Sequence, residues 1–271
     1  MSRKLFVLAC LAGAGVLFAA PSSAADLASA TIAAWNEYVS RTEARIAGEL
    51  ADRRRFLTLD VGKEGDGVRR TLLAGGLVIR RIDAGGTDVP DGTIHHWRAA
   101  VLVPGISLDR LVAALRDPQS HGYKPADVLQ WRLLHRQGAR ERVFLQIQRR
   151  EIVTAVFNTE HDVRFTVHGP GRMSSRSVAT RIAEIADPGT PHAREKPVGR
   201  DRGFLWRLNS YWRYEEVPGG VVVELESLSL SRGVPALLGP VAAPIITRIA
   251  RESIERTLSD IRGQLGRAPR P

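Results

Sequence analysis

The sequence is short of cysteine, lysine and long apolar runs, and each shortage excludes something. Its 271 residues contain one cysteine, Cys10, which excludes an internal disulfide, a CxxC redox pair and a thiolate zinc cluster. Only four of the 39 basic residues are lysines, which indicates a GC-rich coding bias. After residue 24 no apolar run reaches eighteen residues, so we expect a soluble or peripheral protein. The 44% hydrophobic and 25% charged residues are typical of a globular chain.

The first 24 residues have the pattern of a secretory signal peptide. Arg3 and Lys4 precede an uncharged apolar run at residues 5–20, and small residues follow at 21–25. The run is shorter than the ~20 residues that cross a bilayer, so cleavage is expected rather than retention as a membrane anchor. Cleavage would remove Cys10, and a chain without cysteine suits the periplasm. The sequence therefore predicts a periplasmic or secreted protein.

The positive charge remains after such cleavage and has two interpretations. The shortened chain has 37 basic and 29 acidic residues, a net charge of +8. The basic groups either cover a solvated sheet face or contact an anionic membrane surface. They recur at residues 53–55, 69–70, 80–81 and 149–150. Nucleic acid is not an expected partner, because export removes it from the protein's surroundings.

Apolar periodicity predicts helices near both ends of the chain and strands between them. A helix is expected at 27–52, a short one after the N-cap Ser107, and the longest at 235–265. Residues 83–92 and 187–202 are expected to be loops, and residues 160–162 a hairpin turn. The expected strands are 56–60, 68–74, 77–82, 93–103, 128–136, 142–149, 151–158, 162–168, 175–187, 205–215 and 221–230.

This order predicts an α+β fold, in which a curved antiparallel β-sheet grips the long C-terminal helix. The predicted organisation is a signal peptide (1–24), an extra N-terminal helix (25–51), one main domain (52–265) and a flexible tail (266–271). A sheet curved around one helix encloses an apolar cavity more easily than a flat sandwich does.

Six segments in this order resemble the START / Bet v 1-like (SRPBCC) superfamily, whose members have the helix-grip fold. The resemblance covers about residues 52–265 and rests on topology and degenerate motifs. It implies a hydrophobic cavity for lipids, sterols, polyketides or similar ligands, in carriers, binding modules or enzymes of the aromatase/cyclase kind. The segments are His95-His96-Trp97-Arg98-Ala99-Ala100-Val101-Leu102-Val103-Pro104 with 108–117, Tyr123-Lys124-Pro125 with 128–134, and 221–230 leading into 235–265.

Aromatic and apolar side chains are the candidate lining of such a cavity, although core packing explains them equally well. The candidates are Trp97, Trp131, Trp212, Tyr214, Ile245 and Ile249. Glu224 and Glu226 lie on one face of an expected strand. If that face turns inward, one of the two could pair with Arg213 across the hairpin and orient a ligand's polar end. Otherwise both carboxylates face solvent.

No catalytic residue, metal site or cofactor is predicted. The sequence has no HExxH, EF-hand or P-loop motif, and the adjacent His95 and His96 point to opposite faces of a strand. His96 or His135 could titrate near neutral pH, but no partner for either is evident. Three hypotheses remain: a carrier of a hydrophobic ligand, a cyclase, dehydratase or hydrolase of the same fold, and an envelope protein with a filled cavity.

Overall fold

The computed structural model describes residues 28–58, 65–83, 87–125, 127–150, 154–233 and 239–266. The side chains of residues 150, 239–247, 249 and 250 lie outside this description. The predicted signal peptide (1–24) and nearly all of the predicted tail (266–271) also lie outside it.

Four helices and ten strands make up the described residues. The helices are α1 (Ser29–Ala51), α2 (Gly65–Leu73), α3 (Leu108–Arg116) and α4 (Gly239–Leu265). The strands are β1 (Leu77–Arg81), β2 (Thr87–Val89), β3 (Gly92–Pro104), β4 (Val128–Gln137), β5 (Arg140–Arg150), β6 (Thr154–Val167), β7 (Arg172–Ala186), β8 (Arg194–Glu195), β9 (Arg207–Val217) and β10 (Gly220–Arg232).

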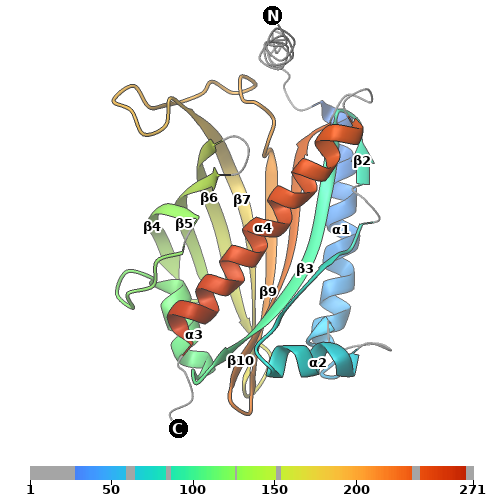
Figure 1. Ribbon diagram of the computed structural model, residues 1–271, viewed down its shortest axis with the longest axis vertical. Coiled ribbons are helices and arrows are strands. Elements are labelled where there is room, and N and C mark those ends of the chain that lie inside the picture. Colours follow the sequence, from blue (N-terminus) through green and yellow to red (C-terminus); the bar gives the residue numbers. More distant parts are fainter. Residues whose placement is uncertain are drawn as a thin grey trace, which may run out of the picture.

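The strands form one curved antiparallel sheet in the order β1-β3-β10-β9-β7-β6-β5-β4, with β2 beside β3 and β8 beside β7. Helix α4 crosses one face of this sheet diagonally, in front in the view of Figure 1. The α+β class and the antiparallel sheet expected from the sequence are confirmed. The strands that the sequence placed at 77–82, 93–103 and 221–230 are β1, β3 and β10.

Alternation along β10 divides the sheet into two faces. Val221, Val223 and Leu225 belong to the core that includes Ile254, Leu258 and Ile261 of α4. The residues between them point the other way. Val222 lies against the α2 core and Leu228 against the α1 core. We call the side of the sheet that packs against α4 the α4 face. The opposite side, which packs against α1 and α2, is the α1 face.

Five local predictions were wrong, and two of them are the loops expected at 83–92 and 187–202, which contain the short strands β2 and β8. Residues 68–74 were expected to be a strand but form most of α2, because Val68 and Leu72, four residues apart, share its buried side. The described part of 56–60 is a turn and not a strand; there Phe56 and Leu57 fill the α2 core. The predicted turn at 160–162 lies inside β6, which is continuous because a register shift after Glu160 absorbs the irregularity.

Candidate functional site

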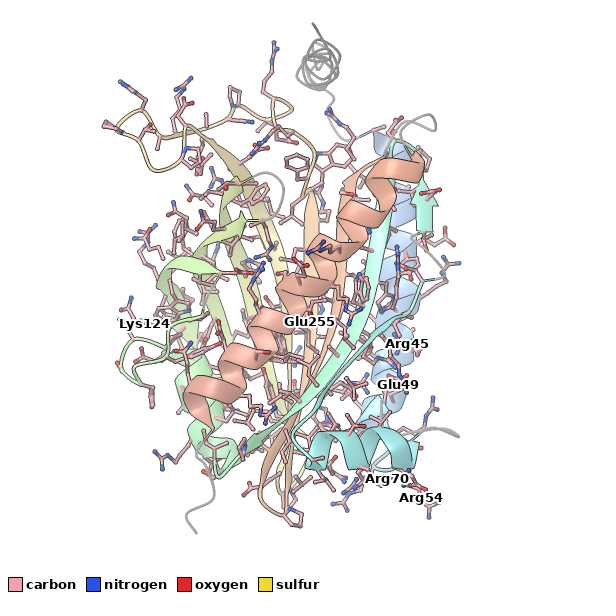
Figure 2. All side chains as sticks on the ribbon, viewed as in Figure 1. Arg45, Glu49, Arg54, Arg70, Lys124 and Glu255 are labelled. Carbon is pink, nitrogen blue, oxygen red and sulfur yellow. The ribbon has the colours of Figure 1, made fainter. Side chains whose placement is uncertain are left out.

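The α1 face holds a buried network of charges. Glu226 is 1% exposed and accepts hydrogen bonds from Arg45 of α1, from Arg98 at 2.9 Å and from His96 at 2.6 Å. Burial alone would raise the pKa of Glu226, but the His96 hydrogen bond and the two arginines hold it well below its usual range. Figure 2 shows Arg45 on α1, one turn before Glu49.

His96 is held within this network and is not exposed in a pocket. An ionised Glu226 can only accept, so His96 Nε2 donates to it. Tyr38 Oη lies 2.9 Å from His96 Nδ1 and covers the ring from α1. The sequence left His96 without a partner, and the structure supplies two. Tyr38 and Arg45 therefore connect α1 to this buried His–carboxylate pair of the sheet.

Arg213 and Glu224 do not lie in the predicted ligand cavity, so that prediction was wrong. Both are buried on the α1 face, where Arg213 Nη2 donates to Glu49 at 2.5 Å and Arg213 Nη1 to the Phe56 carbonyl at 2.9 Å. Glu224 accepts from Thr58 at 2.8 Å and lies 3.7 Å from Arg213 Nε. A pairing of Arg213 with one of the two glutamates was expected and Glu224 is that partner, but α1 and the chain after it cover that face. The alternative that Glu224 and Glu226 face solvent was also wrong.

The α4 face is different in chemistry, because its centre is apolar with a row of uncharged polar groups. Ser177, Ser210 and Ser227 are in register on β7, β9 and β10, and all three are half-buried. Trp97 on β3 continues the row beside Ser227. Neighbours in such a row have Cβ atoms about 4.5–5.5 Å apart, so one ligand could contact several of them.

A chain of hydrogen bonds fixes the state of His161 at one end of this row. The Thr159 hydroxyl donates to the Leu145 carbonyl at 2.9 Å, so its oxygen accepts from His161 Nε2 at 3.0 Å. His161 Nδ1 is then an acceptor, and Ser177 Oγ donates to it at 3.2 Å. Burial lowers the pKa of His161 to about 4, so the ring is neutral at pH 7.

Three of the predicted aromatic residues lie on the α4 face. Trp97 and Tyr214 are buried in its core, with Trp212 half-buried beside them. Trp212 and Tyr214 stack with ring centroids 6.4 Å apart and planes 3° apart. Trp131 is also half-buried but lies on the edge strand β4, opposite Leu145. The side chains of Ile245 and Ile249 fall outside the described residues, although both positions lie in α4.

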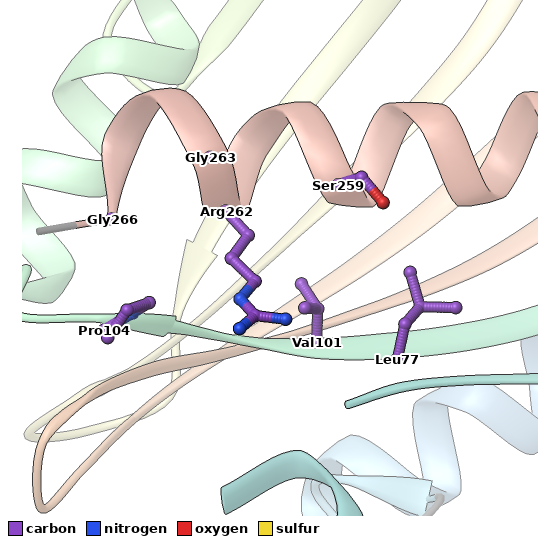
Figure 3. A pocket seen from close by; sticks show the side chains of 7 residues that line it. All are labelled: Leu77, Val101, Pro104, Ser259, Arg262, Gly263 and Gly266. Atoms are coloured by element: carbon purple, nitrogen blue, oxygen red, sulfur yellow. The ribbon is translucent and has the colours of Figure 1, made fainter. Parts of the chain in front are cut away.

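A pocket of about 360 Å³ opens between the end of α4 and the sheet (Figure 3). Leu77 and Val101 form its floor, and Ser259 and Arg262 of α4 cover it. Arg262 Nη1 donates to the Gly75 carbonyl, so its charge is held at the rim. The volume lies at the lower end of the range of small-molecule sites.

Sequence reasoning missed His95, His161 and the serine row. The i, i+2 spacing of His95 and Trp97 places both on one face of a strand. The sequence alone could therefore have grouped His95 with Trp97. His161 gave no such signal, because the turn predicted around it hid its strand position.

Within the described ranges, no three His, Cys, Asp or Glu side chains are grouped so as to bind a metal ion. None of the helices in those ranges has both the length and the hydropathy needed to cross a bilayer.

Comparison with known proteins finds similarity in solved structures only. No protein-family model matches the chain, and no curated protein does. A STAR-related lipid transfer protein from Xanthomonas axonopodis is 17% identical, with 70% of this chain and 98% of that one covered and a TM-score of 0.45. A START superfamily protein from Mycobacterium smegmatis is 10% identical, with 63% and 95% covered and a TM-score of 0.38.

The two-domain aromatase/cyclase StfQ of the steffimycin biosynthetic pathway is 10% identical, with 63% of this chain and 50% of that one covered and a TM-score of 0.41. These are structures of the START and aromatase/cyclase kinds that the sequence resembles. The resemblance that the sequence predicted is to the same kinds of protein. At these identities and TM-scores it concerns the fold alone and indicates neither a ligand nor an activity.

Proposed function

We propose that this protein binds a hydrophobic small molecule, a lipid or similar, between α4 and the α4 face of the sheet. The observation that supports this is the chemistry of that face. It joins an apolar core around Trp97 and Tyr214 to uncharged hydroxyl and imidazole groups, some of them half-exposed. An apolar lining with a few polar groups is typical of small-molecule sites.

The opposite face is a poor alternative for the same ligand. Its buried acids, Glu49, Glu224 and Glu226, all have basic or hydroxyl partners. An apolar ligand entering there would separate these pairs and leave buried charges without compensation, which is strongly unfavourable. We therefore assign binding to the α4 face and a structural role to the α1 face.

We favour binding or carriage over catalysis. The buried pair His96–Glu226 would suit a general base if it faced a ligand, but Tyr38 and Arg45 cover it from α1. On the α4 face His161 is held by hydroxyl groups, Thr159 and Ser177, and not by a carboxylate. This arrangement positions a neutral hydrogen-bonding group and does not raise its basicity.

Export and membrane contact belong to the same proposal. The leader pattern at residues 1–24 supports a periplasmic or secreted location. Exposed arginines, among them Arg54 and Arg70 (labelled in Figure 2), support peripheral contact with anionic lipid head groups. A carrier would collect or deliver its ligand at such a surface.

The test is binding of a long-chain apolar ligand to the purified chain, measured by native mass spectrometry and by calorimetric titration. Ser259→Trp places a ring over the pocket from an exposed position on α4 and should weaken binding. Arg248→Trp adds the same ring at another exposed position of α4 and is the matched control. Failure of lipids, alkanes and alcohols alike to bind would refute the proposal.

A further inference from the structure

We infer that the polar end of the ligand is a hydroxyl group, held by His95 and Trp97 on β3 beneath α4. This inference rests on the proposed function, because it names the ligand chemistry of that same site. His95 and Trp97 are two residues apart on one strand, so their side chains share the α4 face. Each is 6% exposed.

Trp97 has a donor that no described residue uses. Its indole Nε1 is buried and, within the described part of the chain, has no hydrogen-bond partner. An indole N–H only donates, and buried tryptophans usually find an acceptor for it. The position opposite Trp97 on β10 is Ser227, which is half-buried and so leaves room for solvent or a ligand nearby. The missing partner must therefore be an acceptor atom.

His95 has an acceptor that no described residue uses. Its Nε2 lies 3.0 Å from Ser231 Oγ, and the Ser231 hydroxyl donates to the Arg232 carbonyl at 3.4 Å. Nε2 therefore carries the proton and donates to Ser231. Burial lowers the pKa of His95, so the ring is neutral and Nδ1 presents a lone pair. Nδ1 is buried and without a partner among the described residues.

A hydroxyl group can satisfy both side chains, because it accepts one hydrogen bond and donates another. A carboxylate accepts only, and an ammonium group donates only, so each would leave one of the two atoms unbonded. A charged end would also need a buried counter-ion. The nearest cation along β1, Arg81, lies over the Trp97 ring at 5.6 Å and is already paired with Asp83. The geometry thus selects an uncharged alcohol.

The position of α4 places this pair inside the proposed site. Arg262 and Gly263 near the end of α4 lie over Val101 and Pro104 near the end of β3. The earlier turns of α4 continue toward the start of β3, as Figure 1 shows. His95 and Trp97 lie in that earlier part of β3, four to six residues before Val101 or about 13–20 Å along the strand. An alkyl chain running along β3 would thus join the hydroxyl site to the pocket.

The test compares three ligands with one alkyl chain, dodecan-1-ol, dodecane and dodecanoate, by calorimetric titration of the purified chain. The alcohol should bind most tightly. Trp97→Phe, which keeps a ring and removes the N–H, should weaken alcohol binding about 3- to 10-fold and leave dodecane binding unchanged. His95→Phe should act in the same way. Trp206→Phe is the matched control, because Trp206 lies in the α1 core and its Nε1 already donates to Asp201.

A second measurement needs no variant. Dodecan-1-ol, and not dodecane, should move the indole N–H resonance of Trp97 downfield in a ¹H–¹⁵N spectrum. Equal affinity for the three ligands, or an alcohol preference that persists in both variants with an unmoved resonance, would overturn the inference while the proposed function stands. If none of the three binds but a larger lipid does, the inference is overturned and the proposed function stands; if no lipid binds either, the proposed function itself fails.

Discussion

Replacing Arg213 by methionine tests whether the α1 face is a structural interface held by charge. Methionine keeps a long flexible side chain in the same space and removes the guanidinium. Arg213 is 2% exposed and contacts Glu49, Glu224 and the Phe56 carbonyl. Without this guanidinium, the carboxylates of Glu49 and Glu224 stay buried but lose a positive charge beside them.

The expected loss is large, because removing one partner of a buried ion pair costs about 3–5 kcal/mol in the free energy of unfolding. At about 2–4 °C per kcal/mol for a domain of this size, the melting temperature should fall by about 6–20 °C. Burial alone would raise the pKa of Glu49, but hydrogen bonds from Arg213 and Arg45 hold it below its ordinary value. In Arg213→Met that pKa should therefore rise.

Urea unfolding followed by tryptophan fluorescence measures the change. Arg194→Met is the control, because the side chains of Arg194 and its partner Asp187 are 69% and 56% exposed, and such a pair contributes about 0–1 kcal/mol. Arg213→Met combined with Glu49→Leu should cost less than the two single losses added together, by about 0.5–3 kcal/mol. A loss for Arg213→Met no larger than that of the control would refute the interpretation of the α1 face.

Three further predictions concern the stability of variants at Glu226, His161 and Gly220. Because the pKa of Glu226 is lowered, its stabilisation is present above pH 4.5, the ordinary value, and is lost as pH falls. The stability difference between the wild type and Glu226→Gln should therefore shrink below that pH. His161, with a pKa lowered from 6.5 to about 4, should make the wild type lose up to about 3 kcal/mol between these pH values, and His161→Asn should lack this slope. Gly220→Ala should lose about 1–3 kcal/mol, because its φ is +156° and a Cβ there would lie 2.1 Å from the Val103 carbonyl oxygen.

Each of these has its own control in chemical unfolding experiments. Equal pH profiles for the wild type and the Glu226 or His161 variant would show that the group titrates as in the unfolded chain. Gly263→Ala is the comparison for Gly220→Ala, because nothing lies within 4 Å of a Cβ at Gly263, which is inside α4. It should gain about 0.5–1 kcal/mol, since alanine favours a helix over glycine. Loss of stability there would contradict the assigned helix.

Most strands and three helices could be predicted because the spacing of their apolar residues matches the side of the element that is buried. The spacing of Trp35 and Ile46 in α1 matches its buried side. Helix α2 was misread as a strand because it is short, and only Val68 and Leu72 mark its period. In so short a segment the helical and strand patterns differ by few residues.

The orientation of the sheet could not be predicted from alternation. Alternation correctly grouped Glu224 with Glu226 on one face and separated His95 from His96. It could not say which helix covers which face, because that depends on contacts between distant parts of the chain, such as Arg45 with Glu226. The assignment of Arg213 to one cavity with Trp212 and Tyr214 was a different error, because alternation already places it on the opposite face from these two neighbours.

The ion pairs on the α1 face and the uncharged lining at Leu225 and Ser227 on the α4 face depend on one another. Adjacent β10 residues alternate between the two faces, so the ion pairs of Glu224 and Glu226 fix the backbone that presents Leu225 and Ser227 to α4. A loss of charge on the α1 face should thus disturb ligand binding on the other face by moving this backbone, without touching the ligand. Trp97→Phe should instead weaken alcohol binding with the α1-face ion pairs intact, and its loss of stability should be that of a smaller core ring, well below that of Arg213→Met. Measuring both quantities in Arg213→Met and Trp97→Phe therefore separates the residues that hold the sheet from those that meet the ligand.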